Sequence, residues 1–134
     1  MPIPEPPPSQ DRRLALRVVT LPKDTNQYGT IFGGVILSYI DQAGYVEARR
    51  HGAGASQRWV TVALDRVEFK QPVHLGDVVA FYTLATRLGT TSVTVKVEVE
   101  AERYDSGQTV AVTEATITLV CVDRDGKPVP FARR

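Results

Sequence analysis

The sequence is poor in the residues that bind metals or form crosslinks. Cys121 is its only cysteine, which excludes an internal disulfide framework and any zinc site built on two or more thiolates. The two histidines, His51 and His74, lack the i, i+4 spacing of a helical metal pair, and we expect both to lie on the surface. No metal site is therefore expected.

Strong net charge and long apolar runs are also missing. The formal net charge is +1 at pH 7, and no block of like charges suggests a nucleic-acid footprint. No apolar run reaches the roughly 18 to 20 residues that span a bilayer, and the first ten residues lack the basic and apolar regions of a signal peptide. We therefore expect neither nucleic acid nor membrane as a partner, and a cytoplasmic location.

The composition that remains is that of one globular domain, with 43% hydrophobic and 23% charged residues. Residues 1–11 are rich in proline and predict a disordered tail before a single domain over 12–134. A short apolar run from Arg13 to Thr20 predicts a first strand, and turn-forming residues follow to position 29. A long helix comes next, with Thr30 as its expected N-cap and Gly52 as its C-terminal stop.

Every later segment has the pattern of a strand. The predicted strands span residues 59–73, 77–88, 92–102 and 109–123. The third alternates strictly, with valines on one face and threonine, lysine and glutamates on the other. Short turns between these strands favour antiparallel neighbours. We therefore predict an α+β fold in which a curved antiparallel sheet wraps around one long central helix.

One carboxylate on the helix, Asp41, is unusual because its neighbours on the same helix face are small or apolar. At 100° per residue it lies at the centre of a stripe of small and apolar side chains, which comprises Gly34, Leu37, Gly44, Tyr45 and Ala48. Gly44 costs roughly 1 kcal/mol relative to alanine inside a helix, which indicates that something approaches closely there. Asp41 is either a buried structural acid or a functional group, and the pattern leaves both open.

Two glycines at the start of the helix suggest what a functional Asp41 would do. Gly33 and Gly34 leave backbone N–H groups unbonded and uncovered, where they suit a developing oxyanion, although such glycines also simply allow close packing. Acyl transfer needs a base or nucleophile together with such donors. Gly33 and Asp41 are about 12 Å apart along the helix axis, so one helix cannot easily present both to one carbonyl carbon. Antiparallel helices of a two-fold dimer could do so.

Several motifs in order resemble those of the hotdog-fold acyl-CoA thioesterases, in the YciA-like acyl-CoA hydrolase branch. They are DTNQYGTIFGGVILSYIDQAGYVEA (24–48), VTVALDRVEFKQPVHLGDVV (60–79), LGTTSVTVKVEVE (88–100) and DRDGKPVPF (123–131). The most specific is N-x-x-G-x-x-F-G-G followed seven residues later by aspartate. The resemblance implies the hotdog fold, homodimers that assemble into hexamers as trimers of dimers, and hydrolysis of acyl-CoA to a free carboxylic acid and CoA. Coenzyme A would be part of the substrate, with no separate cofactor.

The resemblance also assigns roles to individual residues. Asn26 and Asp41 would form the catalytic pair, contributed by opposite subunits, with Asp41 as general base on a water or as nucleophile. Asn26 would orient the water or the thioester, and the N–H groups around Gly33 and Gly34 would bind the oxyanion. Without the resemblance, Asn26 is more simply a loop cap.

Coenzyme A would be held by a second group of residues. The LGTTS stretch resembles the loop that helps to hold CoA in this family, and the residues that the resemblance selects are Gly89, Thr91 and Ser92 in the loop, with Arg87 and Lys70 as candidates for phosphate contacts. This chain departs from the family at Thr90, where many relatives carry a basic residue.

Other functions remain as alternatives. A hotdog hydratase would be expected to carry a histidine on the helix, paired with an acid. No histidine falls between Gly29 and Arg50. Ser38 lacks the G-x-S-x-G context of a serine hydrolase. A non-catalytic acyl-CoA sensor usually needs an output domain, for which no segment is left over. A catalytically inactive thioesterase homologue stays open as an alternative, although both Asn26 and Asp41 are present. The acyl chain length is left open.

Overall fold

A computed structural model describes residues 11–54 and 57–134. Its elements are β1 (Arg13–Val19), a 3-10 turn η1 (Pro22–Asp24), α1 (Gly33–His51), β2 (Arg58–Asp65), β3 (Val78–Leu88), β4 (Ser92–Glu102) and β5 (Thr109–Val122). The predicted order of one strand, one long helix and four strands is confirmed. The predicted disordered tail falls, apart from Asp11, outside the described residues.

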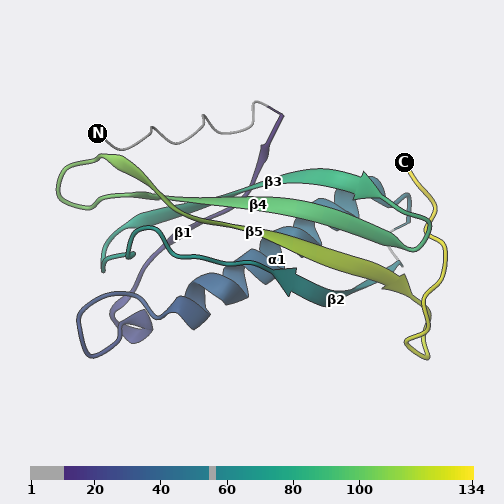
Figure 1. Cartoon of the computed structure of the whole chain (residues 1–134), viewed down its shortest axis with the longest axis horizontal. Coiled ribbons are helices and arrows are strands. Elements are labelled where there is room, and N and C mark those ends of the chain that lie inside the picture. The colour runs from purple at the N-terminus through teal and green to yellow at the C-terminus, as the bar shows by residue number, and fades with distance from the viewer. Residues whose placement is uncertain (1–10, 55–56) are drawn as a thin grey trace.

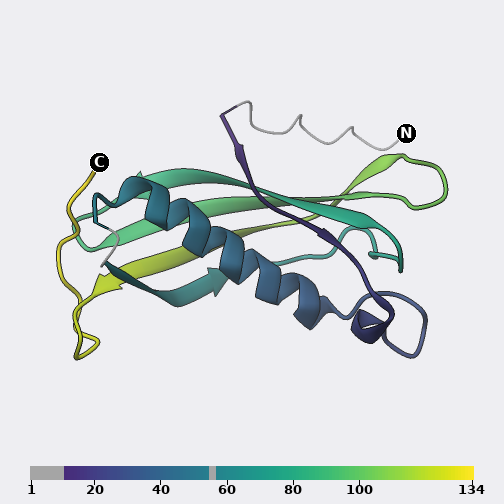
Figure 2. The ribbon, with the colours of Figure 1, turned by 180° about the vertical axis from the view of Figure 1, so that it is seen from behind.

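All five strands form one antiparallel sheet in the order β1-β3-β4-β5-β2. Helix α1 lies across one face of this sheet and contacts every strand (Figures 1 and 2). The end of the chain returns to the C-terminal end of the helix, where the Arg134 N–H donates to the His51 carbonyl at 3.0 Å. The predicted α+β architecture, with a sheet wrapped around one helix, is confirmed.

The core lies between α1 and the sheet. Strand β4 alternates as predicted, with its valines buried at 0–1% exposure, and Ile36, Ile40 and Ala43 face them from the helix. Burying each large aliphatic side chain contributes roughly 1.5–3 kcal/mol. A Cβ at Gly44 would lie 2.7 Å from Cγ2 of Ile117 in β5. The close approach that the glycine indicated is therefore made by the sheet.

The second predicted strand is wrong in length and in neighbour. Strand β2 ends at Asp65 and not at residue 73, because Arg66 takes a left-handed conformation (φ 54°) that an extended strand cannot continue. Residues 66–77 then run from the β2 edge of the sheet towards the opposite edge, where β3 pairs with β1. Hydrogen bonds to β5 hold the crossing segment, from the Lys70 N–H to Val112 O and from Thr113 Oγ1 to Glu68 O. Strands β1 and β2 are consequently the two sheet edges.

The start of the helix also differs from the prediction. Phe32 is the N-cap, without a side-chain capping bond, and the helix begins at Gly33. Thr30 is not the cap because its hydroxyl accepts a hydrogen bond from Asn26 Nδ2 and its backbone bridges to His74. Gly52 is the C-cap, as predicted. Within the described ranges, no helix combines the length and hydropathy needed to cross a bilayer.

Candidate active site

Asp41 lies on the exposed flank of α1. Ile40, one residue earlier and about 100° around the helix, is fully buried against the sheet, so Asp41 points away from the core. Within a single chain, the alternative of a buried structural acid is therefore wrong. Instead Asp41 lines an open groove of about 460 Å³ between α1 and β2. The other residues lining this groove are Gln42, Tyr45, Trp59, Val60 and Thr61.

A hydroxyl from β2 fixes the Asp41 carboxylate. Thr61 Oγ1 donates a hydrogen bond to Asp41 Oδ1, and both residues are exposed to the groove. Sequence reasoning missed Thr61. The available signal was a hydroxyl residue inside an otherwise apolar strand, flanked by Val60 and Val62. An oriented carboxylate in an open groove can accept a proton or attack an electrophile.

Asn26 organises the loop that precedes the helix. Its Oδ1 accepts from the backbone N–H groups of Tyr28 (2.9 Å) and Thr30 (3.1 Å), while Nδ2 donates to Thr30 Oγ1 at 2.8 Å. The loop-cap interpretation is thus correct within one chain. Because an amide carries two N–H donors, the cap leaves Asn26 one donor for a further group.

The first turn of α1 presents open backbone donors. Gly33 and Gly34 are exposed, and among the described residues no acceptor faces either N–H. A Cβ at Gly34 would meet no heavy atom within 4 Å, and one at Gly33 would lie 3.5 Å from the Phe69 ring. A ligand oxygen could therefore approach these N–H groups, and the helix N-terminus favours negative charge there.

A single chain does not bring these groups together. Gly33 and Asp41 are eight residues apart on one straight helix, about 12 Å along its axis, and Asn26 lies beyond the N-terminal end. Edge strand β2, next to the groove, carries exposed apolar side chains, with Val60 42%, Val62 58% and Leu64 38% exposed. An open edge with apolar side chains is a surface that a second chain can cover.

The candidate CoA residues separate into two places. Gly89, Thr91 and Ser92 form the turn between β3 and β4, where the Gly89 N–H donates to Ser92 O at 2.8 Å and a Cβ on Gly89 would collide with Ser92 Oγ. Arg87 is exposed beside this turn. The C-terminal segment holds the turn in place, because Arg133 Nη2 donates to the carbonyls of Leu88 and Gly89 at 2.9 Å each.

Lys70 is remote from that turn. It bonds to Val112, whereas Ser92 pairs with Val120 eight residues further along β5, a separation of about 27 Å at 3.4 Å per residue. Lys70 instead lines a pocket with Arg66, Glu68 and Glu114. Lys70 therefore cannot join the turn residues around one phosphate within a single chain.

Sequence reasoning missed a second carboxylate, Glu47, which is the buried acid of the helix. Glu47 is 1% exposed and accepts hydrogen bonds from Arg13 (2.6 Å), Arg50 (2.9 Å) and Thr83 (2.9 Å). Its Oε2 also lies 2.5 Å from His51 Nε2, so His51 is part of this cluster and not simply a surface residue. The signal was the spacing of Ile36, Ile40, Ala43 and Glu47, which places the acid on the buried stripe.

Electrostatics at Glu47 favour its ionised form. Burial alone would raise the pKa of Glu47, but the hydrogen bonds from Arg13, His51, Thr83 and Arg50 together outweigh it and hold the pKa below its usual value. The acid therefore anchors the C-terminal half of α1 to β1 and β3. Among the described residues, no group of three or more histidine, cysteine, aspartate or glutamate side chains could hold a metal ion.

Comparison with known proteins adds independent information. A family model described as the thioesterase superfamily matches residues 28–108. The acyl-CoA thioester hydrolase YciA of Salmonella typhimurium is 41% identical over 121 residues, which cover 88% of this chain and 89% of that protein. YciA of Escherichia coli is 41% identical over 118 residues, with 86% and 87% covered.

Solved structures are similar over nearly the whole chain. A hexameric broad specificity acyl-coenzyme A thioesterase superposes with a TM-score of 0.85 at 36% identity, covering 95% of this chain and 86% of that one. A hexameric hotdog fold thioesterase of Campylobacter jejuni has a TM-score of 0.81 at 44% identity, with 89% and 90% covered.

Proposed function

Since this chain belongs to the thioesterase superfamily and has the hotdog fold, we propose that it hydrolyses acyl-CoA thioesters at sites shared between two subunits. The family and the fold implied by the sequence motifs are thereby confirmed, and the relatives named above are acyl-CoA thioester hydrolases. The observation that carries the shared site is the exposed Asp41 carboxylate, bonded by Thr61 in a groove at an open sheet edge, at a distance from the free N–H groups of its own helix.

Asp41 does the chemistry in this proposal. As a general base it takes a proton from a water molecule while the water oxygen attacks the thioester carbonyl carbon; the C–S bond then breaks and the proton passes to the CoA sulfur. As a nucleophile it would attack the thioester carbonyl carbon and form a transient anhydride as the C–S bond breaks and the CoA thiolate leaves. Water would then open the anhydride, which releases the free acid, restores the Asp41 carboxylate and supplies the proton that the thiolate takes up. The Thr61 hydroxyl holds the carboxylate in a fixed orientation in either case.

The partner subunit completes the site. Its Gly33 and Gly34 N–H groups would bind the oxyanion that develops on the carbonyl oxygen, where one such donor is typically worth about 3–4 kcal/mol of transition-state stabilisation. Its Asn26 would use the second amide N–H to orient the water or the thioester. This arrangement gives two equal sites per dimer.

Assembly in the proposal begins at β2. Two β2 edges pair antiparallel across a two-fold axis, which covers Val60, Val62 and Leu64 and places the N-terminal end of one helix near the groove of the other. The similar solved structures named above are hexameric. We expect this chain to form the same homo-oligomer, a trimer of such dimers, which light scattering would detect.

A thiol-release assay tests the activity. Wild type, Asp41→Ala and Asn26→Ala are compared on acetyl-, hexanoyl- and palmitoyl-CoA, with a chelator present because we expect no metal requirement. We expect wild type to release CoA from at least one ester, and Asp41→Ala to lose about 100-fold or more in kcat. Binding of the esters without hydrolysis would favour the sensor alternative.

Asn26→Asp separates the two roles of Asn26. Aspartate keeps the oxygen that accepts from Tyr28 and Thr30 but loses the amide donor. We expect a folded protein with kcat reduced by about tenfold or more. Retention of full activity in this variant would assign Asn26 to the loop cap alone.

A further inference from the structure

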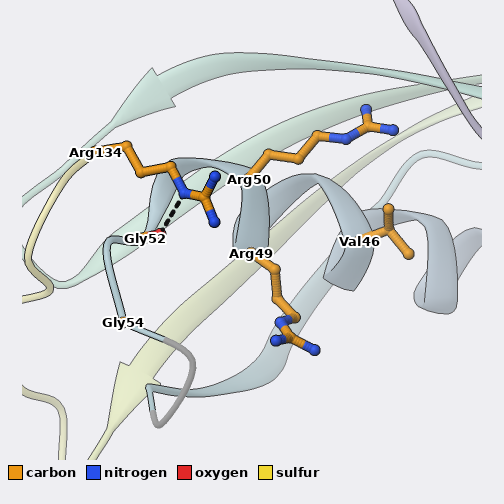
Figure 3. Close-up of a pocket in the computed structure, with 6 residues that line it drawn as sticks. All are labelled: Val46, Arg49, Arg50, Gly52, Gly54 and Arg134. Carbon is orange, nitrogen blue, oxygen red and sulfur yellow. Dashed lines mark hydrogen bonds between the residues drawn. The ribbon is translucent and has the colours of Figure 1, made fainter.

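A second pocket, at the C-terminal end of α1, is rich in arginine. It has a volume of about 220 Å³ and is lined by Val46, Arg49, Arg50, Gly52, Gly54 and Arg134 (Figure 3). None of these lining residues is acidic. Three arginines from two distant parts of the chain therefore line one pocket.

The three arginines differ in what they already bind. Arg50 is committed elsewhere: it donates to Glu47 Oε1 and to the Leu14 carbonyl, and Figure 3 shows it extending away from Arg49 and Arg134. Arg134 is fixed in place because its Nε donates to the Gly52 carbonyl at 3.0 Å.

Two guanidinium groups are left to receive a ligand. Arg134 uses only Nε for that bond, which leaves its two terminal nitrogens for another acceptor. Arg49 stands 5.8 Å from the ring of Tyr45. Within the part of the chain that the structure describes, neither Arg49 nor Arg134 forms an ion pair with an acidic side chain.

This arrangement suits a phosphate group. Two guanidinium groups without a carboxylate repel one another, and a planar fork of N–H donors matches phosphate oxygens bidentately. The carbonyls at the end of a helix disfavour an anion, but here the carbonyls of His51 and Gly52 already accept N–H groups of Arg134. The local field is therefore set mainly by the arginines.

The pocket lies further along α1, towards its C-terminal end, than the groove that contains Asp41. Asp41, Tyr45 and Arg49 follow one another at i, i+4 and i+8 along the exposed side of α1, so Arg49 lies about 12 Å from Asp41 along the axis. The turn formed by residues 88–92 is at the same end of the molecule, bound by Arg133 next to Arg134. In an acyl-CoA, an uncharged pantetheine arm separates the thioester from the phosphates.

Building on the proposed function, we propose that Arg49 and Arg134 bind a phosphate group of the CoA part of the substrate. The thioester then lies at Asp41 and the pantetheine arm passes over Tyr45. These two arginines determine specificity for CoA esters over thioesters without phosphate, and they take no part in the chemical step.

The test compares hexanoyl-CoA with hexanoyl-pantetheine, which lacks the nucleotide and all of its phosphates. In the double variant Arg49→Gln with Arg134→Gln, we expect KM for hexanoyl-CoA to rise about tenfold or more with kcat unchanged, while KM for hexanoyl-pantetheine stays as in wild type. The control variant is Arg124→Gln, which removes an arginine charge in an exposed turn outside the pocket. It should change neither KM. An equal change for both thioesters, or none, would overturn the proposal.

A binding measurement keeps this test independent of catalysis. Inorganic pyrophosphate is titrated calorimetrically into wild type and the double variant, and we expect binding that the variant loses. Absence of pyrophosphate binding to wild type would overturn the phosphate site even if the enzyme is active. Loss of pyrophosphate binding with an unchanged KM for hexanoyl-CoA would show a phosphate site that the substrate does not use, and would overturn its assignment to CoA.

Discussion

Glu47→Gln should destabilise the protein strongly, although the change is isosteric and remote from Asp41. The substitution removes the negative charge at the centre of the cluster that joins α1 to β1 and β3. It leaves the guanidinium groups of Arg13 and Arg50 facing a neutral amide. Removing one partner of a buried ion pair typically costs about 3–5 kcal/mol because the remaining charge is poorly solvated.

The magnitude here should lie at the lower end of that range. The Glu47 side chain is 1% exposed, but that of Arg13 is 50% exposed and can regain water. We therefore expect a loss of about 3 kcal/mol in the free energy of unfolding. For a chain of this length, each kcal/mol shifts Tm by roughly 3–4 °C, so Tm should fall by about 10 °C.

The loss should also depend on pH in a defined direction. Because the folded state holds the pKa of Glu47 below the usual glutamate value of 4.5, the ionised acid stabilises the fold above that pH. This contribution fades as the pH falls from 4.5 through the folded pKa. Glutamine has no such titration, so the difference in stability between wild type and variant should shrink in acid.

Urea unfolding at a fixed protein concentration, between pH 7 and pH 3.5, measures both effects; the concentration is fixed because an oligomer's stability depends on it. Glu114→Gln is the control, since Glu114 pairs with Lys96 at 3.5 Å on the surface with 55% of its side chain exposed, and should cost at most about 1 kcal/mol. A loss at Glu47 no larger than this control, or a difference that does not shrink in acid, would refute the reasoning.

Three further substitutions probe the site and the helix. Thr61→Val removes the hydroxyl bonded to Asp41 and should lower kcat about tenfold, or 1.4 kcal/mol, with Tm unchanged, whereas Thr61→Ser should retain the rate in the same thiol-release assay. Gly44→Ala places a Cβ 2.7 Å from Ile117 and should lose about 1 kcal/mol in urea unfolding, because overpacking of about 1–3 kcal/mol exceeds the helix-propensity gain of about 1 kcal/mol. Gly34→Ala meets open space, so stability should be unchanged or raised by up to about 1 kcal/mol, yet kcat should fall because the methyl group crowds the proposed oxyanion position.

A strand with one buried and one exposed face could be predicted from the sequence. The end of a strand that is set by its pairing partner could not. The alternation over residues 92–102 matches β4 to the residue, because each valine faces the helix and each polar residue faces solvent. The run after Asp65 has the same β-branched and aromatic character, but it leaves the sheet at Arg66 to cross to the other edge. Local propensity cannot contain that information, since only tertiary pairing decides where β2 stops.

The same distinction applies to the candidate site, of which the sequence predicts the residues that lie along one element but not the contacts between elements. Asp41 and the helix glycines follow from motif spacing along one element. The sequence left open whether Asp41 is buried, because helical periodicity gives relative angles and not the face that meets the sheet. Glu47 shared the buried stripe unnoticed, and Thr61 reaches Asp41 only because the fold lays β2 beside α1.

The central claim, hydrolysis at sites shared by two subunits, is tested most directly by mixing two inactive variants. Asp41→Ala and Asn26→Ala chains are refolded together and assayed for CoA release. In a mixed dimer one site keeps both Asp41 and Asn26 and the other has neither. Because half of randomly formed dimers are mixed, about one quarter of wild-type activity should return. A mixture no more active than its separate components would contradict the shared site.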